Sequence, residues 1–362
     1  MKRFIGFEHG MGLGGWLTNY KRFNVLPSDK QLDITVGDME HFASYITERD
    51  IEYIASLGMD HIRLGFDQIV LEQSPYVYRE QIFTYIDGFL SWCKKYGLNV
   101  VLNLHKALGN YCDIKANVGL LDDDELQNRF IALWLKIEQR YSDKGDIAFE
   151  LLNEVLNVPP QKWNALAAKT VNAIRKINKT RKIIIGSVCW NSVNTLKDLQ
   201  VFDDDNVIYT FHFYEPFEFT HQKSVLQELT MYYNRTMPYP GDIDRYRDYK
   251  RTVLGDSDPY SGYEIMDIRV IRDLLRPAAD FTASHPDKIL WCGEFGTIRH
   301  ADIKWRENWT RDVITVLKEN DIPYCVWNYL STPNDGNRFS LVDDESRIIL
   351  SENMAKIIIG EV

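Results

Sequence analysis

Short apolar runs rich in β-branched residues recur along the whole chain, and most are followed by a segment with the spacing of an amphipathic helix. Eight such runs predict strands, at His9–Trp16, Met59–Leu64, Leu98–Leu104, Ile147–Leu152, Lys182–Gly186, Asn206–Phe211, Ile289–Cys292 and Pro323–Trp327. The pattern between them predicts helices that include Gln81–Tyr96, Gln127–Tyr141 and Gln161–Asn178. Eight strands that alternate with helices predict an α/β protein with a closed (β/α)8 TIM barrel, and a doubly wound open sheet is the alternative.

One connection is much longer than the others. Residues 215–265, between the sixth strand and the next helix, include Tyr232, Tyr233, Tyr239, Tyr246, Tyr249, Tyr260 and Tyr263. A connection of this length in a compact domain is usually functional or forms a small subdomain. We therefore expect residues 1–362 to form a single domain, with a Tyr-rich lid over the active-site face. A peripheral decoration that packs its own rings is the other interpretation.

The charge balance limits the partners. The 362 residues carry 42 Lys and Arg against 52 Asp and Glu, a net charge of −10, which repels phosphate backbones and anionic lipid. We expect no nucleic acid or membrane partner, and a monomer. No apolar run reaches the length of a membrane span or a signal peptide, so the protein is expected to be cytoplasmic, or secreted with its signal peptide absent from this chain.

Aromatic residues are abundant and cysteines are scattered. The chain has 9 Trp, 20 Tyr and 17 Phe, which suggests flat apolar platforms at a surface. The five cysteines show no CxxC spacing, and we interpret them as buried apolar side chains in a reducing compartment.

Polar side chains stand at the ends of the predicted strands in an ordered way. They are Arg63 in the second strand, His105 after the third, Asn153 and Glu154 after the fourth, His212 and Tyr214 after the sixth, Glu294 after the seventh and Trp327 at the eighth. In a (β/α)8 barrel the carboxyl ends of the strands converge on one mouth, where the chemistry takes place. These side chains are therefore predicted to form one site.

Glu154 and Glu294 give the sharpest signal, because a carboxylate directly after a buried strand is costly unless it is paired or functional. A helix-terminal or structural ion-pair role is the ordinary alternative for either one alone. Two carboxylates facing one cleft supply both halves of retaining glycoside hydrolysis, which places them about 5–5.5 Å apart.

Other chemistries are not supported. The glycines of residues 10–15 imitate a nucleotide-binding motif, but they lead into Trp16 and a loop rather than a helix. The sequence contains no HExxH motif, no His-x-His at the first strand and no GxSxG elbow. We expect neither a metal nor any other cofactor.

Six motifs in order resemble glycoside hydrolase family 5. They are HIRLGF at 61–66, VLNLH at 101–105, LNE at 152–154, FHFY at 211–214, GEFG at 293–296 and VWNY at 326–329. Within this cellulase family the endoglucanase C-like group is most similar, through GLGGW at 12–16, FDQI at 66–69, LSWCKKY at 90–96, AFELLNEV at 148–155 and FHFYEPFEFTHQK at 211–223. That group also carries a subdomain after the sixth strand.

The resemblance implies roles at matching positions. Glu154 would be the general acid/base and Glu294 the nucleophile. Asn153 would donate to the sugar 2-hydroxyl, Arg63 and Tyr214 would contact Glu294, and His105 and His212 would line the cleaved subsite. Trp327 would stack under the sugar beside the scissile bond. Trp16 and Trp190, which end or follow strands, are further platform candidates.

We therefore expect a retaining endo-β-1,4-glucanase that hydrolyses soluble β-glucans, including cellulosic chains, mixed-linkage β-1,3-1,4-glucan and glucomannan. A β-mannanase, or an exo-acting β-glucosidase or β-1,3-glucanase, is the alternative within the family. A non-catalytic carbohydrate-binding barrel is the alternative from another class, and it would require one of the two glutamates to be replaced.

Overall fold

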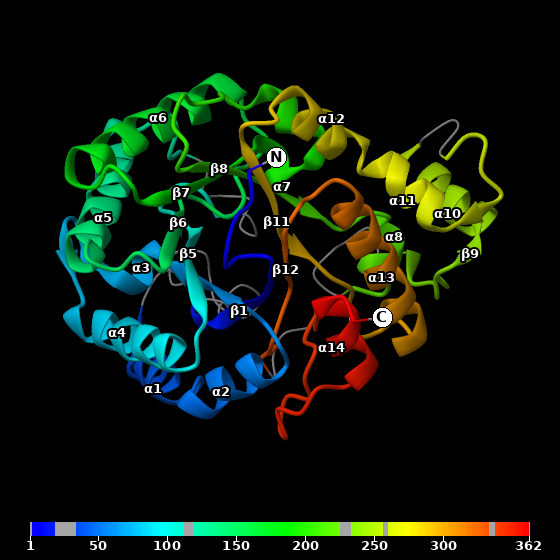
Figure 1. Cartoon of the computed structure of the whole chain (residues 1–362), viewed down its shortest axis with the longest axis horizontal. Coiled ribbons are helices and arrows are strands. Elements are labelled where there is room, and N and C mark those ends of the chain that lie inside the picture. Colours follow the sequence, from blue (N-terminus) through cyan, green and yellow to red (C-terminus); the bar gives the residue numbers. More distant parts are fainter. Residues whose placement is uncertain are drawn as a thin grey trace.

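A closed ring of eight parallel strands forms the centre of the protein (Figure 1). The computed structural model describes residues 2–18, 34–111, 119–224, 233–255, 260–332 and 337–361. Around the ring the strands are neighbours in the order β1-β12-β11-β8-β7-β6-β5-β2. Their bounds are β1 His9–Leu17, β2 His61–Asp67, β5 Asn99–Lys106, β6 Ile147–Glu150, β7 Lys182–Gly186, β8 Val207–Phe213, β11 Ile289–Phe295 and β12 Tyr324–Val326. Each corresponds to one predicted strand, so the (β/α)8 barrel is confirmed.

Helices surround the ring on its outer side (Figure 1). They are α1 Val36–Ser44, α2 Glu48–Ser56, α3 Gln68–Leu71, α4 Glu80–Lys95, α5 Asp124–Tyr141, α6 Pro160–Ile177, α7 Val188–Asn191, α8 Phe217–Thr220, α10 Ile243–Tyr249, α11 Ile268–Leu274, α12 Arg276–Ser284, α13 Ile303–Glu319 and α14 Glu352–Ile359. Shorter elements are the 3-10 helix η2 Val193–Asp198, the π-helix η3 Lys250–Leu254 and strands β3 Glu72–Ser74, β4 Val77–Tyr78, β9 Gly241–Asp242 and β10 Ile265–Met266. The three predicted helices correspond to α4, α5 and α6. Among the described residues, no helix combines the length and apolar character needed to cross a bilayer.

The interior of the barrel changes from apolar to polar along the strands. At the amino-terminal end of the barrel, strand residues pack with Phe4 and Phe7. The aromatic rings of Phe4 and Phe7 stack with their centroids 4.2 Å apart and cover this end of the barrel. These strand residues are Val101, Ala148, Ile184, Ile208, Trp291 and Cys325. Because strand side chains alternate between two faces, residues two positions further along point into the same interior. Those six positions hold Asn103, Glu150, Thr210 and Trp327, with glycines at 186 and 293, so polar groups collect at the carboxyl end.

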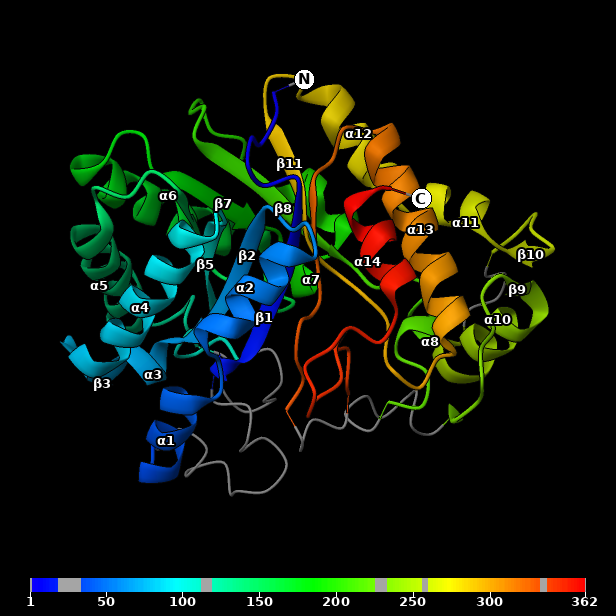
Figure 2. The same cartoon turned by 60° about the horizontal axis from the view of Figure 1, so that its bottom comes forward.

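The long connection after β8 has two parts. Residues 215–224 stay close to the barrel mouth, and the described residues from 233 onward lie on the outer flank beside α11 and α13 in both views (Figures 1 and 2). The Tyr239 hydroxyl donates to Asp312 of α13 at 2.7 Å, and Tyr246 and Tyr249 are buried. Tyr232 lies outside the described residues. A lid over the cleft therefore stays a prediction.

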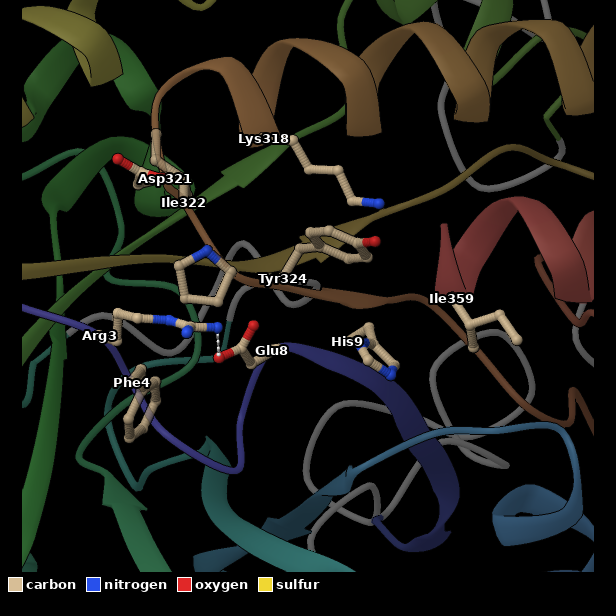
Figure 3. A pocket seen from close by; sticks show the side chains of 10 residues that line it. Arg3, Phe4, Glu8, His9, Lys318, Asp321, Ile322, Tyr324 and Ile359 are labelled. Atoms are coloured by element: carbon tan, nitrogen blue, oxygen red, sulfur yellow. Dashed lines mark hydrogen bonds and ion pairs between the residues drawn. The ribbon is translucent and has the colours of Figure 1, made fainter. Parts of the chain in front are cut away.

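A cavity of about 440 Å³ opens at the amino-terminal end of the strands (Figure 3). Its lining includes Phe4, His9, Lys318 and Tyr324, together with an Arg3–Glu8 ion pair. Residues at this end of a (β/α)8 barrel ordinarily serve stability rather than chemistry.

Candidate active site

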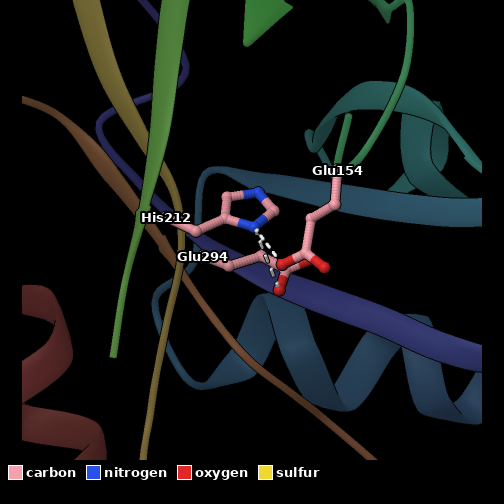
Figure 4. A group of neighbouring side chains, drawn as sticks. All are labelled: Glu154, His212 and Glu294. Atoms are coloured by element: carbon pink, nitrogen blue, oxygen red, sulfur yellow. Dashed lines mark hydrogen bonds and ion pairs between the residues drawn. The ribbon is translucent and has the colours of Figure 1, made fainter. Parts of the chain in front are cut away.

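Glu154, His212 and Glu294 meet at the carboxyl end of the barrel (Figure 4). Glu154 follows β6, His212 lies in β8 and Glu294 lies in β11. The His212 Nδ1 is 2.9 Å from the Glu154 Oε1 and 3.6 Å from the Glu294 Oε2. One carboxylate oxygen of each glutamate and one ring nitrogen of His212 all lie within 4.8 Å of one another. Two glutamates that lie 140 positions apart in the chain thus face one small volume.

Arg63 is the buried centre of the polar network. Its Nε and Nη2 donate to the two carboxylate oxygens of Glu150, at 2.6 and 2.9 Å. Its Nη2 also donates to the Asn153 Oδ1 at 2.6 Å, and its Nη1 donates to the Glu294 Oε1. Burial alone would lower the pKa of Arg63, but the charges of Glu150 and Glu294 raise it above its ordinary value. The guanidinium is therefore held permanently charged against Glu294.

Glu294 is held as a carboxylate. Besides Arg63, the Tyr214 hydroxyl donates to its Oε2 at 2.8 Å. Burial would raise the pKa of Glu294, but the favourable charge interactions with His212 and Arg63 and the Tyr214 hydrogen bond lower it to about 2. The carboxylate is thus ionised at any pH at which the protein would ordinarily work.

Glu154 has the opposite tendency. Burial raises the pKa of its carboxyl, and the nearby charge of Glu294 raises it further, while the hydrogen bond from His212 offsets only part of this effect. The pKa values of two carboxyl groups in one pocket are thereby shifted in opposite directions. One is suited to hold a proton and the other to act as an anion, the division that acid/base and nucleophilic chemistry require.

Trp327 and His105 form the floor of the site. Their rings are parallel within 9°, with centroids 5.5 Å apart. The His105 Nδ1 is 3.0 Å from the Asn103 Oδ1, and burial lowers the pKa of His105 to about 3, so its ring is neutral. An added Cβ at Gly12 would lie 2.7 Å from the Trp327 ring, and one at Gly14 would lie 2.4 Å from it. The glycines of β1 therefore make room for the indole.

The cleft beside the two glutamates has a volume of about 580 Å³. Trp190, 46% exposed, stands on its rim with Asn194, and Phe217, His221 and Phe339 line it as well. The His221 ring stacks on Phe217 with centroids 4.0 Å apart and lies 4.9 Å from Phe339. The cleft is thus an open, aromatic-lined depression, of the kind that binds the apolar faces of sugars.

One predicted platform is wrong. Trp16 is only 1% exposed, donates its Nε1 to the Phe42 carbonyl at 2.8 Å and packs on Phe89. The β1–β2 register shifts between Leu13 and Leu17, and Gly15 has a φ of +75°. This irregularity turns Trp16 outward, into the layer between strands and helices, although strict alternation from Gly12 and Gly14 would have pointed it into the barrel.

The remaining sequence-predicted residues come together. They are Arg63, His105, Asn153, Glu154, His212, Tyr214, Glu294 and Trp327, with Trp190 at the edge of the cleft. Sequence reasoning missed Glu150, which anchors Arg63, and Phe217, His221 and Phe339, which line the cleft. Glu150 could have been found as the charged residue inside the apolar run IAFELL. Nothing in the sequence distinguishes Phe217, His221 and Phe339 as residues of the cleft.

Glu154, His212 and Glu294 are also residue types that bind divalent metals. Arg63 already places a positive charge against Glu294, and His212 uses its Nδ1 on Glu154. A divalent cation would be repelled by the first contact and would have to break the second. The arrangement therefore fits two working carboxyl groups better than a metal site.

A (β/α)8 barrel with two carboxyl groups of oppositely shifted pKa at its mouth, beside an aromatic cleft, is an arrangement typical of glycoside hydrolases. The family model for cellulase (glycosyl hydrolase family 5) matches residues 27–332. The chain belongs to this family and is a glycoside hydrolase of the endoglucanase type.

Several characterised proteins are similar to the chain. Endoglucanase C of Acetivibrio thermocellus is 41% identical over 334 residues, which cover 90% of this chain and 92% of the relative. Cellodextrinase A of Ruminococcus flavefaciens is 31% identical over 89% of this chain and 85% of that protein. The crystal structure of Thermotoga maritima Cel5A with cellobiose matches with a TM-score of 0.73 at 24% identity, over 97% of both chains. This last likeness supports the fold.

The contact between Trp327 and the glycines of β1 gives a first prediction. Gly14→Ala should displace the indole and lower kcat/KM on a β-glucan by about 100-fold, the scale of an ångström-sized misplacement. Gly88→Ala in α4, where an added Cβ meets no atom within 4 Å, is the matched control. It should leave kcat/KM unchanged and stabilise the helix by about 0.5–1 kcal/mol. Kinetics and thermal unfolding of both variants test the prediction, and unchanged kcat/KM in Gly14→Ala would contradict it.

Proposed function

We propose that the protein is a retaining endo-β-1,4-glucanase that hydrolyses soluble β-glucans, with Glu294 as nucleophile and Glu154 as general acid/base. One observation carries the proposal: two carboxyl groups, one with a lowered and one with a raised pKa, have oxygens within 4.8 Å. Retaining enzymes hold their two carboxyl groups about 5–5.5 Å apart, whereas inverting enzymes need room for a water between them.

The reaction follows in two balanced steps. The Glu294 carboxylate attacks the anomeric carbon, and the bond to the leaving oxygen breaks as Glu154 transfers its proton to that oxygen. In the second step Glu154, now ionised, takes a proton from water, and the resulting hydroxyl oxygen displaces Glu294 from the anomeric carbon. Glu154 ends protonated and Glu294 ends as the carboxylate, ready for another cycle.

The neighbouring residues have supporting roles in this scheme. Arg63 and Tyr214 orient Glu294, and His212 orients Glu154. Because the Asn153 Oδ1 accepts from Arg63, its amide nitrogen is left to donate to the sugar 2-hydroxyl. Trp327, with His105 behind it, offers a flat face to the sugar that Glu294 attacks. Trp190 stands on the Glu154 side of the cleft and is suited to stack on the leaving sugar.

The substrate is proposed to be a β-glucan oligo- or polysaccharide: cellulosic chains, mixed-linkage β-1,3-1,4-glucan or glucomannan. The endoglucanase names of relatives at up to 41% identity support glucan. A β-mannanase is the second candidate, since Thermotoga maritima Cel5A has been crystallised with mannotriose as well as cellobiose. Initial rates on barley β-glucan, carboxymethylcellulose, glucomannan, mannan and laminarin would rank these substrates.

Removal of each glutamate should give a different kinetic signature. Glu294→Ala should abolish turnover of every substrate, because no glycosyl-enzyme can form. Glu154→Ala should still react in the first step with a dinitrophenyl β-cellobioside, whose leaving group needs no proton. Its second step should be slow and should be rescued by azide, with formation of a β-glycosyl azide. Equal residual activity of the two variants towards this substrate, without azide rescue, would contradict the assigned roles.

The raised pKa of Glu154 also predicts the pH dependence. Only the protonated form of Glu154 can donate, so kcat/KM on a glucan should fall as pH rises through that pKa. Because the pKa is raised, the active range should extend to higher pH than an ordinary glutamate would allow. The Glu294 pKa of about 2 places the acidic fall below the usual assay range. With the unmodified protein the basic fall should be present for a glucan and absent from kcat/KM for the dinitrophenyl substrate, which needs no proton from Glu154. A basic fall that persists with the dinitrophenyl substrate would show that another group controls it.

The open cleft predicts internal cleavage. Labelled cellohexaose should give several shorter oligosaccharides at early times, and the viscosity of a soluble glucan should drop before many reducing ends appear. Release of glucose or mannose alone from one chain end, followed by chromatography, would instead support the exo-acting alternative. In that case the connection at residues 215–265 would be the first place to look for a closed end of the cleft.

A further inference from the structure

The main chain that carries Glu154 has no regular structure of its own. Strand β6 ends at Glu150 and helix α6 begins only at Pro160, so residues 151–156 lie in neither. Backbone groups in such a segment still need partners when they are buried. Some of their partners are backbone groups of the neighbouring strands β5 and β7, and the others come from the connections after these two strands.

Asn110 holds the segment from the β5 side. Its Nδ2 donates to the Glu154 carbonyl at 2.8 Å, and its Oδ1 accepts from the Leu156 N–H at 3.3 Å. The side chain thus spans Val155, the residue directly after Glu154, and it is buried at 4% exposure. This amide therefore fixes the main chain on the C-terminal side of Glu154.

Asn191 holds the segment from the β7 side. Its Nδ2 donates to the Asn153 carbonyl at 3.4 Å, and its Oδ1 accepts from the Ser187 N–H at 2.8 Å. The side chain is completely buried and lies against Gly186, where an added Cβ would come within 2.6 Å of it. The glycine at this position makes the close approach possible.

The backbone of α7 is unusual at the same place. Cys189, Trp190 and Asn191 have φ values of 59°, 57° and 56°, three successive left-handed residues that are not glycine. This conformation is unfavourable for residues with a Cβ, so surrounding contacts must hold it. The Cys189 N–H donates to the Leu156 carbonyl at 3.2 Å, and the Trp190 N–H donates to the Val155 carbonyl at 2.8 Å. The strained turn that exposes Trp190 is therefore bonded directly to the Glu154 segment.

We propose that Asn110 and Asn191 are positioning residues for Glu154, and that Asn191 also couples Glu154 to the Trp190 ring on which the leaving sugar stacks. This inference rests on the proposed function, because it assumes that Glu154 donates the proton. The two amides hold the main chain of Glu154 from opposite sides. The direction of the Glu154 carboxyl group and the place of the leaving sugar are then set together, while Glu294 keeps its own hydrogen bonds from Arg63 and Tyr214.

The proposal predicts a loss confined to proton donation. Asn110→Ala and Asn191→Gly should lower kcat/KM for phenyl β-cellobioside by about ten-fold, a part of the 10²–10⁴-fold that general acid catalysis supplies. For dinitrophenyl β-cellobioside, which needs no proton, kcat/KM should stay within about two-fold, because the contacts of Glu294 are intact. Glycine is chosen at position 191 because it adopts the left-handed backbone freely. The pH at which kcat/KM falls on the basic side should also move in both variants.

Asn164→Ala is the matched control. Asn164 lies on α6, where its Nδ2 donates to the Asp198 carbonyl at 2.9 Å and its Oδ1 accepts from the Gln200 N–H at 3.2 Å. It bridges two backbone groups as Asn110 does, but away from the site. Both substrates and the pH profile should be unaffected in this variant.

The outcomes distinguish a failure of the positioning proposal from a failure of the proposed function. If Glu154→Ala shows no dependence on the leaving group, the proposed function fails. If Glu154→Ala shows it but the asparagine variants lower both substrates equally, or neither, the positioning proposal is overturned and the proposed function stands. Should Asn191→Gly not fold by circular dichroism, Asn110→Ala decides, because it removes the amide bonded to the Glu154 carbonyl and leaves Asn191 in place.

Discussion

The buried guanidinium of Arg63 is the interaction on which the rest of the site depends. A charge taken out of water is tolerated only when its donors are satisfied and its charge is balanced. Arg63 meets both conditions through Glu150, Asn153 and Glu294. Glu150 occupies one side of the guanidinium with two parallel hydrogen bonds, so the opposite edge can point only towards Asn153 and Glu294. The orientation of two proposed catalytic groups therefore follows from an ion pair that does not touch the substrate.

The same charge distribution separates the two carboxyl groups. Glu294 lies against Arg63, Tyr214 and His212, and these contacts outweigh the cost of burying its charge. Glu154 receives only the His212 contact, and it faces the negative charge that Glu294 has gained. Stabilising one anion therefore raises the pKa of the other carboxyl group. The proposed acid and the proposed nucleophile, which are the same residue type, differ because positive charge is distributed unequally around them.

The sequence was informative wherever the barrel repeats a regular pattern. Alternating strands and helices predict all eight strands, and the convergence of strand ends predicts that Arg63, Glu154, His212 and Glu294 meet. Prediction failed where local geometry breaks the pattern. Trp16 follows a register shift and a left-handed Gly15, so its side chain leaves the face that alternation assigns to it. Glu150 was missed because a sequence does not reveal which buried carboxylate anchors an arginine and which one reacts.

The loop contributions could not be predicted for a different reason. Asn110 and Asn191 act on the main chain of another segment, and such contacts depend on how two irregular connections fold beside each other. Neither residue type nor spacing carries that information. Only the folded main chain of residues 153–156 shows that its backbone groups bond to these two side chains.

The two halves of the cleft are built by different means. Trp327, His105 and Glu294 are held by strands or directly at their ends, over glycines that leave room for an indole. Trp190, Phe217 and His221 belong to connections outside the strands, and Trp190 stands on a turn that neighbouring backbone groups must hold in place. Strand positions can change little without opening the barrel, whereas connections can change in length and composition. In the proposed mechanism the strand ends therefore hold the nucleophile, whereas the connections shape the side of the cleft that is proposed for the leaving sugar.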